Sequence, residues 1–297
     1  MSLQEYALES VVRQTESTMV HRGRRLADGL RVVMKLPRAA YPTAEQLDAL
    51  VREHALLVRA APTGVMVEVI ALERTTNTVA LVLEDLGDRT LGTLIREAST
   101  DLVERVAIAA RVAEALERLH DAGIVHRDVN PEHVRLLDGD VVKLLDLHIA
   151  SIDDPENRTS AADRLEGTVA YMSPEQTGRV GCPVDRRSDL YSLGVTLFEL
   201  FAGRRPFTSD QLLELVHCHV ARVPASLDEI DPRIPRPLAR IVARLLAKSP
   251  DDRYQSAASL RADLERCLAG LRAGDLADFE LGALDRRGDL RAPATHH

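Results

Sequence analysis

Tryptophan is absent from the 297-residue sequence, and aromatic residues make up only 3% of it. Apolar residues nevertheless account for 45%, so a sizeable core is feasible, built mostly of Leu, Val, Ile and Ala. Cysteine is also scarce, since Cys182, Cys218 and Cys267 lie far apart and no pair has the spacing of zinc ligands. This pattern argues against a disulfide framework and against a zinc site, and it favours a reducing, cytoplasmic compartment.

No apolar run is long enough to span a bilayer, and the N-terminus has no signal-peptide pattern, so we expect no insertion into a membrane. Basic tracts are missing too, and the net charge is -8, which argues against a nucleic-acid partner and against binding to anionic membranes. Of the 38 basic residues only three are Lys: Lys35, Lys143 and Lys248. A Lys in so Arg-rich a chain indicates a position where Arg does not serve.

Hydrophobic periodicity predicts a β-rich beginning of the chain. Strand patterns occur at residues 30–36, 65–71 and 78–83, and an amphipathic helix is expected at residues 44–59. The Gly-Asp dipeptide at residues 87–88 marks a break, where we expect a cleft between two parts of the chain.

The remainder of the chain is predicted to be mainly helical. Expected helices lie at residues 102–120, 188–201, 210–220, 234–246 and 256–271. Two short strands at residues 134–137 and 141–145 flank a turn and are typical of a hairpin. Residues 272–297 are rich in Gly, Ala, Asp and Arg, which is typical of a linker or tail.

Two aspartates stand at positions suited to phosphate chemistry. His126-Arg127-Asp128 follows a buried helix and precedes the expected hairpin, and Asp146 comes directly after the second hairpin strand. One carboxylate can orient or deprotonate a hydroxyl, while the other can hold Mg²⁺ against phosphates. Each signal alone is weak, because His-Arg-Asp also occurs by chance.

Six motifs in the same order and spacing resemble those of the protein kinase family, over roughly residues 6–271. They are Lys35, Glu53, Asp128 with Asp146, Gly167–Glu175, Asp189–Gly194 and Arg253. The resemblance implies an α+β, two-lobed protein kinase fold, with a small β-rich N-lobe at residues 1–86, a larger helical C-lobe at residues 87–271 and a linker or tail at residues 272–297. It also implies transfer of the ATP γ-phosphate to a serine or threonine hydroxyl of a protein.

The resemblance further implies a role for each matched residue. Lys35, paired with Glu53, holds the phosphates of ATP, although Glu45 is a competing partner on the same helix. Asp128 is the catalytic base, and Asp146 is the ligand of Mg²⁺ or Mn²⁺. The implied ATP-binding residues are Val20, Val33, Lys35, Leu83, Glu84, Leu86 and Asp146, with the backbone of Glu84 and Leu86 holding adenine.

An activation segment is implied between Asp146 and residue 175. Thr159, Ser160 and Thr168 lie in it, and phosphorylation of Thr159 or Ser160 would order the segment through Arg127. Thr168 is expected instead to hydrogen-bond to the catalytic loop. The remaining matched residues are structural: His126, Arg127, Asp189, and Glu175 with Arg253, which are expected to form a buried ion pair.

Several residues depart from the family pattern. Arg13, Thr15 and Thr18 occupy the positions of the glycines that usually cover the phosphates. His133 replaces the Asn that holds a second metal ion, and imidazole is a poor substitute as a ligand of Mg²⁺, whereas Mn²⁺ can tolerate it. His148 stands where the family has glycine. These departures leave three functions open: a serine/threonine protein kinase, a pseudokinase acting as a regulatory protein-binding module, and a small-molecule phosphotransferase.

Two further stretches, Tyr171–Arg179 and Val216–Val220, are similar to the N-terminal kinase domain of large bacterial sensor proteins. That resemblance implies ATPase, GAF and histidine kinase modules beyond the tail, in a longer polypeptide that works in signal transduction. It implies a protein substrate but does not name it.

Overall fold

The computed structural model describes residues 3–153 and 167–285 and divides the chain into two compact units. The first unit comprises residues 1–88 and 143–150, and the second comprises residues 89–142 and 151–297. Residues 143–150 thus group with the β-rich first unit, although they follow part of the helical second unit in the sequence. The expected α+β class is confirmed, with a β-sheet in the first unit and mainly helices in the second.

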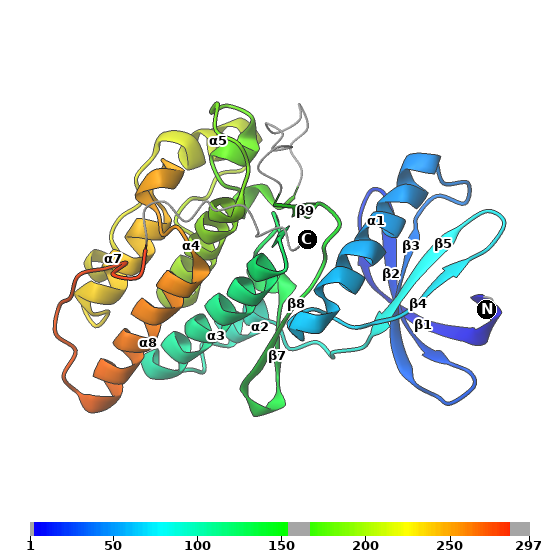
Figure 1. The fold of residues 1–297 in the computed structure, drawn as a ribbon, viewed down its shortest axis with the longest axis horizontal. Coiled ribbons are helices and arrows are strands. Elements are labelled where there is room, and N and C mark those ends of the chain that lie inside the picture. Colours follow the sequence, from blue (N-terminus) through cyan, green and yellow to red (C-terminus); the bar gives the residue numbers. More distant parts are fainter. Residues whose placement is uncertain (1–2, 154–166, 286–297) are drawn as a thin grey trace, which may run out of the picture. The chain divides into compact units, whose positions relative to one another are not determined.

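The first unit is built on an antiparallel sheet of five strands in the order β1-β2-β3-β5-β4 (Figure 1). The strands are β1 (Tyr6–Gln14), β2 (Thr18–Arg25), β3 (Arg31–Pro37), β4 (Val69–Arg74) and β5 (Val79–Glu84). The expected helix is confirmed as α1 (Ala44–Ala60), which begins with a capping box between Thr43 and Gln46. Because its capping bonds satisfy free backbone N–H groups, the helix starts where the sequence predicts.

The register of the sheet separates a core face from a second face. Val32 and Met34 of β3 are buried and pack with Tyr6, Ala80 and Val82. The alternate residues of β3 point the other way, since side chains alternate along a strand. Val33 is opposite Leu83, and Lys35 is opposite both Val20 and Leu81. Four predicted site residues therefore share one face of the sheet: Val20, Val33, Lys35 and Leu83.

The predicted strand at residues 65–71 is displaced, because β4 begins only at Val69. Residues 65–67 are buried and apolar, and they pair with Leu144 instead of continuing the sheet. Leu144 donates its N–H to Val65 O at 2.7 Å and accepts from the N–H of Val67 at 3.2 Å. The run is extended, as predicted, but its first residues pair with Leu144 and its last residues pair with β5.

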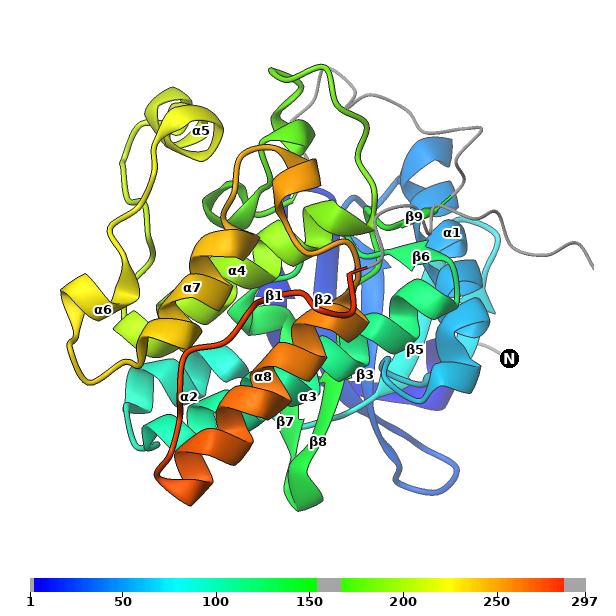
Figure 2. The ribbon, with the colours of Figure 1, turned by 60° about the vertical axis from the view of Figure 1, so that its left-hand side comes forward.

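The second unit contains most of the helices (Figure 2). They are α2 (Leu91–Glu97), α3 (Leu102–Asp121), α4 (Arg186–Ala202), α5 (Leu212–Ala221), α6 (Leu227–Ile230), α7 (Arg236–Leu245) and α8 (Ala257–Ala273). Its short strands are β6 (Ile124–Val125), which pairs with β9 (Ser151–Ile152), and β7 (Val134–Leu137), which pairs with β8 (Val141–Leu144). Of the β8 residues, the last two belong to the first unit.

The core of the second unit lies around α3 and α4. The buried helix expected at residues 102–120 is confirmed as α3, in which Val106, Ala109 and Leu116 are buried. Helix α8 packs along α3, as Figure 2 shows. Within α4, a Cβ added to Gly194 would lie only 2.6 Å from Leu245 Cβ of α7, so α4 and α7 approach too closely for any larger residue there.

Residues 275–285 follow α8 and pack against α7 and α8. Arg244 of α7 forms an ion pair with Asp285 at 2.7 Å and donates to Leu281 O at 2.8 Å. Phe279 is buried, and the guanidinium of Arg266 lies 4.3 Å from its ring centroid. The part of the predicted tail that the structure describes is therefore attached to the helices. The predicted division into residues 1–86, 87–271 and 272–297 stays a prediction.

Lys143 and Lys248 each join elements within their own unit. Lys143 of β8 contacts the carboxylate of Glu84 at the end of β5. Lys248 donates to His219 O at 2.9 Å and to Cys218 O at 3.3 Å, which fixes the end of α5. Burial, and secondarily the charge of Arg253, lower the pKa of Lys248 to about 8. Among residues 3–153 and 167–285, no helix combines the length and apolarity needed to cross a membrane.

Candidate active site

Lys35 is bonded to two carboxylates within the first unit. Its Nζ donates to both oxygens of Glu53, at 3.0 and 2.8 Å, and to Asp146 Oδ1 at 2.8 Å. Burial by itself would lower the pKa of Lys35, but the carboxylates of Asp146 and Glu53 together raise it above its usual value. The ammonium therefore stays charged, and the structure pairs it with Glu53 rather than with Glu45.

Side chains with nitrogen donors contact both oxygens of the Asp146 carboxylate. Besides Lys35 at Oδ1, His148 Nδ1 lies 2.9 Å from Oδ1, and Arg13 Nη1 lies 3.3 Å from Oδ2. Burial opposes protonation of His148, but its hydrogen bond with Asp146 raises the pKa of the imidazole. Asp146 has a left-handed backbone with φ of 68°, which is uncommon for a residue other than glycine. Both oxygens of this carboxylate thus have cationic or protonatable partners.

A divalent ion at this site would require oxygen ligands. Over the described ranges 3–153 and 167–285, no three or more His, Cys, Asp or Glu side chains form a cluster that could hold a metal. Asp146 does supply carboxylate oxygen, the donor that Mg²⁺ and Mn²⁺ prefer. Nucleotide phosphates supply further oxygens. Asp146 therefore fits an ion that is bound jointly by the protein and a nucleotide, and not an ion that is bound by protein side chains alone.

The residues predicted to contact ATP lie in or directly after the sheet of the first unit. Val20 and Val33 are half-buried and Leu83 is buried, all on the sheet face that carries Lys35. The backbone N–H of Glu84 donates to Glu68 O at 3.0 Å, so any bond from Glu84 to adenine must use its carbonyl. Leu86 follows β5 and is half-buried.

Asp128 lies in the second unit and is buried. Its Oδ1 accepts from the backbone N–H of Thr168 at 3.0 Å and from Asn130 Nδ2 at 3.2 Å. These bonds fix the direction of the carboxylate. The predicted bond between Thr168 and the catalytic loop is therefore present, whereas Thr159 and Ser160 lie outside the described residues.

Asp189, in the first turn of α4, holds the loop that precedes Asp128. Its buried carboxylate accepts from the backbone N–H of His126 at 2.8 Å and of Arg127 at 2.7 Å. His120 Nε2 lies 2.9 Å from the same carboxylate. Arg127 has a left-handed φ of 67°, so these bonds stabilise a strained backbone next to the predicted base. His126 is fully buried beneath the loop, as its structural role implies.

His133 is buried beside Asp128, and its Nδ1 is used within the loop. That nitrogen lies 2.9 Å from Asp128 O and 3.0 Å from Asn130 Nδ2. The contacts give His133 a role in holding the loop, and its role as a metal ligand stays a prediction. Asn130 was not singled out as a site residue, although its amide bridges Asp128 and the hydroxyl of Thr168.

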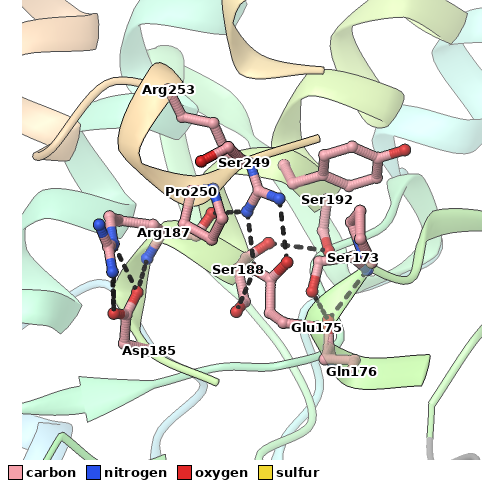
Figure 3. A network of polar contacts seen from close by, with 12 residues as sticks. Ser173, Glu175, Gln176, Asp185, Arg187, Ser188, Ser192, Ser249, Pro250 and Arg253 are labelled. Carbon is pink, nitrogen blue, oxygen red and sulfur yellow. Dashed lines mark hydrogen bonds and ion pairs between the residues drawn. The ribbon is translucent and has the colours of Figure 1, made fainter. Parts of the chain in front are cut away.

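Glu175 and Arg253 form the predicted ion pair, fully buried in the second unit (Figure 3). Arg253 Nη1 and Nη2 donate to the two oxygens of Glu175, at 2.7 and 2.9 Å. Ser188 of α4 donates to Glu175 at 2.6 Å, and Gln176 beside it donates to Arg127 O at 2.6 Å. The pair thus anchors a segment that reaches the backbone next to Asp128.

Arg13 and Gln176 are further site residues that sequence reasoning did not assign. Arg13 was noted only as the replacement of a glycine, yet its guanidinium meets Asp146. Gln176 was part of a matched stretch, without a role of its own. The direction of a long side chain on an exposed hairpin is not visible in the sequence, so only the unusual residue type at position 13 signalled it.

The chain was compared with known proteins. It is 38% identical to a probable serine/threonine-protein kinase of Streptomyces coelicolor over 210 residues, which are 70% of this chain and 31% of that protein. It is 38% identical to the serine/threonine-protein kinase PknB of Mycolicibacterium smegmatis over 166 residues, 56% of this chain and 26% of that protein. It is also 56% identical over 98 residues to the hybrid signal transduction histidine kinase G of Dictyostelium discoideum, 33% of this chain and 3% of that protein.

The chain thus spans at most 31% of the length of these relatives. The family model of the protein kinase domain matches residues 6–263, a range that contains Lys35, Glu53, Asp128 and Asp146. The β-sheet first unit and the helical second unit agree with this match. The chain belongs to the protein kinase family, as the order of its motifs implied.

Proposed function

We propose that this chain is a serine/threonine protein kinase domain of bacterial signal transduction, which transfers the γ-phosphate of ATP to a protein hydroxyl. The observation that carries the proposal is the bonding of Lys35 to both Glu53 and Asp146. The two carboxylates hold this buried ammonium in place, so its side chain needs no further ordering when a phosphate oxygen replaces one of these three contacts.

The first unit is proposed to bind ATP. Lys35 binds the α- and β-phosphates, and Glu53 keeps its ammonium in place. The apolar face formed by Val20, Val33 and Leu83 packs against the purine, and the Glu84 carbonyl and the Leu86 backbone hold adenine. Mg²⁺ or Mn²⁺, held by Asp146 and, in the case of Mn²⁺, by His133, would neutralise phosphate charge when bound.

The second unit is proposed to act on the substrate hydroxyl. Asp128 orients this hydroxyl and accepts its proton as the new oxygen–phosphorus bond forms and the bond to the β,γ-bridging oxygen breaks. The products are a phosphoprotein and ADP. Thr168 and Asn130 keep the Asp128 carboxylate in one orientation through the hydrogen bonds that they donate to Oδ1.

The wider setting is part of the same proposal. We propose that ATPase, GAF and histidine kinase modules follow the chain in a longer cytoplasmic polypeptide, because the stretches at residues 171–179 and 216–220 resemble such sensor proteins and because one relative is named as a histidine kinase. Phosphorylation of Thr159 or Ser160 is proposed to regulate the domain through Arg127.

Transfer of labelled γ-phosphate from ATP to a generic protein substrate tests the proposal. Asp128→Asn is expected to abolish transfer and to leave ATP binding intact, while the exposed control Asp121→Asn keeps both. ATP binding is measured in parallel by thermal shift without metal, with Mg²⁺ and with Mn²⁺, beside Lys35→Ala. Stabilisation by ATP without any transfer would refute kinase activity in favour of the pseudokinase role.

A further inference from the structure

We infer that the Arg13 guanidinium pairs with the Asp146 carboxylate when no divalent ion is bound there. The positive charge of Arg13 thereby makes ATP binding depend less on such an ion. The inference rests on the proposed function, since it concerns the residues proposed to bind ATP. It assigns a role to a position where the family has a glycine.

The β1–β2 turn is held by its own polar groups and does not rely on glycine. The N–H of Thr15 donates to Thr18 O at 2.9 Å, and the two hydroxyl oxygens lie 2.9 Å apart. Arg38, just after β3, donates its N–H to Ser17 O at 2.9 Å. A turn closed in this way presents Arg13, one residue before the end of β1, at a fixed place.

Arg13 contacts the oxygen of the Asp146 carboxylate to which Lys35 does not bond. Lys35 and His148 bond to Oδ1 of Asp146, whereas Arg13 Nη1 lies 3.3 Å from Oδ2. An ion that binds Asp146 through Oδ2 must compete with this guanidinium. The side chain of Arg13 is 45% exposed, so it can leave Asp146 without unpacking the core.

Four formal charges at this site balance without any metal. Lys35 and Arg13 carry one positive charge each, and Asp146 and Glu53 carry one negative charge each. Their sum is therefore zero. With glycine at position 13 the sum would be one negative charge, which would attract a divalent ion.

The same guanidinium is suited to the phosphates of ATP. Arginine presents several N–H donors in a rigid plane, which match phosphate oxygens, and it stays charged at any pH of interest. In the absence of an ion, Arg13 supplies positive charge that the ion would otherwise bring. ATP binding is then expected to depend less on Mg²⁺ or Mn²⁺ than in a site with glycine.

The alternative is that the contact of Arg13 with Asp146 has no effect on ATP binding, since exposed ion pairs contribute little free energy. The same hairpin offers a matched control for this alternative. Arg24 of β2 forms an exposed pair with Glu9 of β1 at 2.8 Å. Its removal takes away the same charge from the same hairpin, without touching Asp146.

The test compares wild type, Arg13→Ala and Arg24→Ala in the full 297-residue chain. Calorimetric titration gives the dissociation constant of ATP in EDTA, in Mg²⁺ and in Mn²⁺. Arg13→Ala is expected to raise the ratio of the constants in EDTA and in metal by at least about threefold, the size of an exposed ion pair. Arg24→Ala is expected to leave that ratio unchanged. An unchanged ratio in Arg13→Ala, or an equal change in Arg24→Ala, would overturn the inference.

The outcome is separable from that of the proposed function. A changed ratio without phosphate transfer would refute kinase activity and support the role of Arg13. An unchanged ratio with transfer that depends on Asp128 would refute the role of Arg13 alone. Absence of ATP binding in every variant and condition would refute both.

Discussion

Replacement of Arg253 by methionine should destabilise the chain more than removal of any exposed charge. All five N–H groups of its guanidinium have acceptors. Two bond to Glu175, and the others bond to the carbonyls of Arg187, Ala247 and Lys248, at 2.9, 2.8 and 3.0 Å. Methionine fills part of the volume but donates none of these bonds.

The expected loss of stability follows from the carboxylate that remains buried after the substitution. After Arg253→Met, the Glu175 carboxylate remains buried, and the hydroxyl of Ser188 still donates to it at 2.6 Å. Breaking one side of a buried ion pair costs about 3–5 kcal/mol. Since domains are stable by about 5–15 kcal/mol, this would remove a large part of the free energy of unfolding. Arg253→Lys should recover only part of it, because an ammonium has three donors instead of five.

Urea unfolding followed by circular dichroism measures the loss, since the chain has no tryptophan to report by fluorescence. The matched control is Arg233→Met, whose partner Asp231 lies 2.8 Å away while Arg233 itself is 89% exposed, and it should cost less than about 1 kcal/mol. The double variant Glu175→Met with Arg253→Met should be less destabilised than Arg253→Met alone, because no buried charge remains unpaired. A loss below about 1 kcal/mol in Arg253→Met would refute the reasoning.

Three further predictions concern other parts of the second unit. Asp189→Asn should lower thermal stability and phosphate transfer together, because the amide cannot accept from both backbone N–H groups that Asp189 holds, and the exposed control Asp121→Asn should change neither. Burial, and next the charge of Lys248, lower the pKa of His219 to about 4, so the unfolded chain takes up a proton between about pH 6.5 and pH 4 that the folded chain does not. The free energy of unfolding should therefore fall by up to about 3 kcal/mol as the pH drops through this window, and urea titrations of His219→Gln should show less of this fall. Arg244→Ala should speed thermolysin cleavage within residues 275–285 by at least about threefold, since it removes the contacts to Asp285 and Leu281, and equal cleavage rates would contradict this.

The elements that the sequence predicted well are those whose pattern is local. Helix α1 has its capping residues and its apolar face within one stretch, and α3 has many buried apolar residues between Val106 and Leu119. Helix ends agreed to within about two residues for the same reason. The strand predicted at residues 65–71 joins the sheet only from Val69, because residues 65–67 pair with Leu144, which lies far along the sequence.

The candidate site shows the same division. Lys35, Asp128 and Asp146 were found because residue type and spacing mark them. The choice between Glu53 and Glu45 as the partner of Lys35 needed the structure. Both lie on the same helix, and the partner is the one whose side chain points toward Lys35. The contact between Arg13 and Asp146 joins residues 133 positions apart, so no local pattern could predict it.

His133 illustrates a limit of reasoning from residue type. A histidine at a metal position suggests a ligand, but its Nδ1 is bonded to the backbone of Asp128 and lies beside the amide of Asn130. Loop-holding contacts of this kind depend on the conformation of the loop. The sequence therefore leaves the contacts of His133 undetermined, and its role as a metal ligand stays a prediction.

The scarcity of lysine has a practical consequence for labelling. Besides the terminal amine, amine-directed reagents have three targets in 297 residues: Lys35, Lys143 and Lys248. Each of them donates to acceptors within its unit, so acylation would release a contact that joins structural elements. Coupling of a dye or a sensor surface through a lysine amine would therefore yield molecules that have lost one of these contacts. The thiol of Cys182 is exposed and offers an attachment point that leaves all three lysines intact.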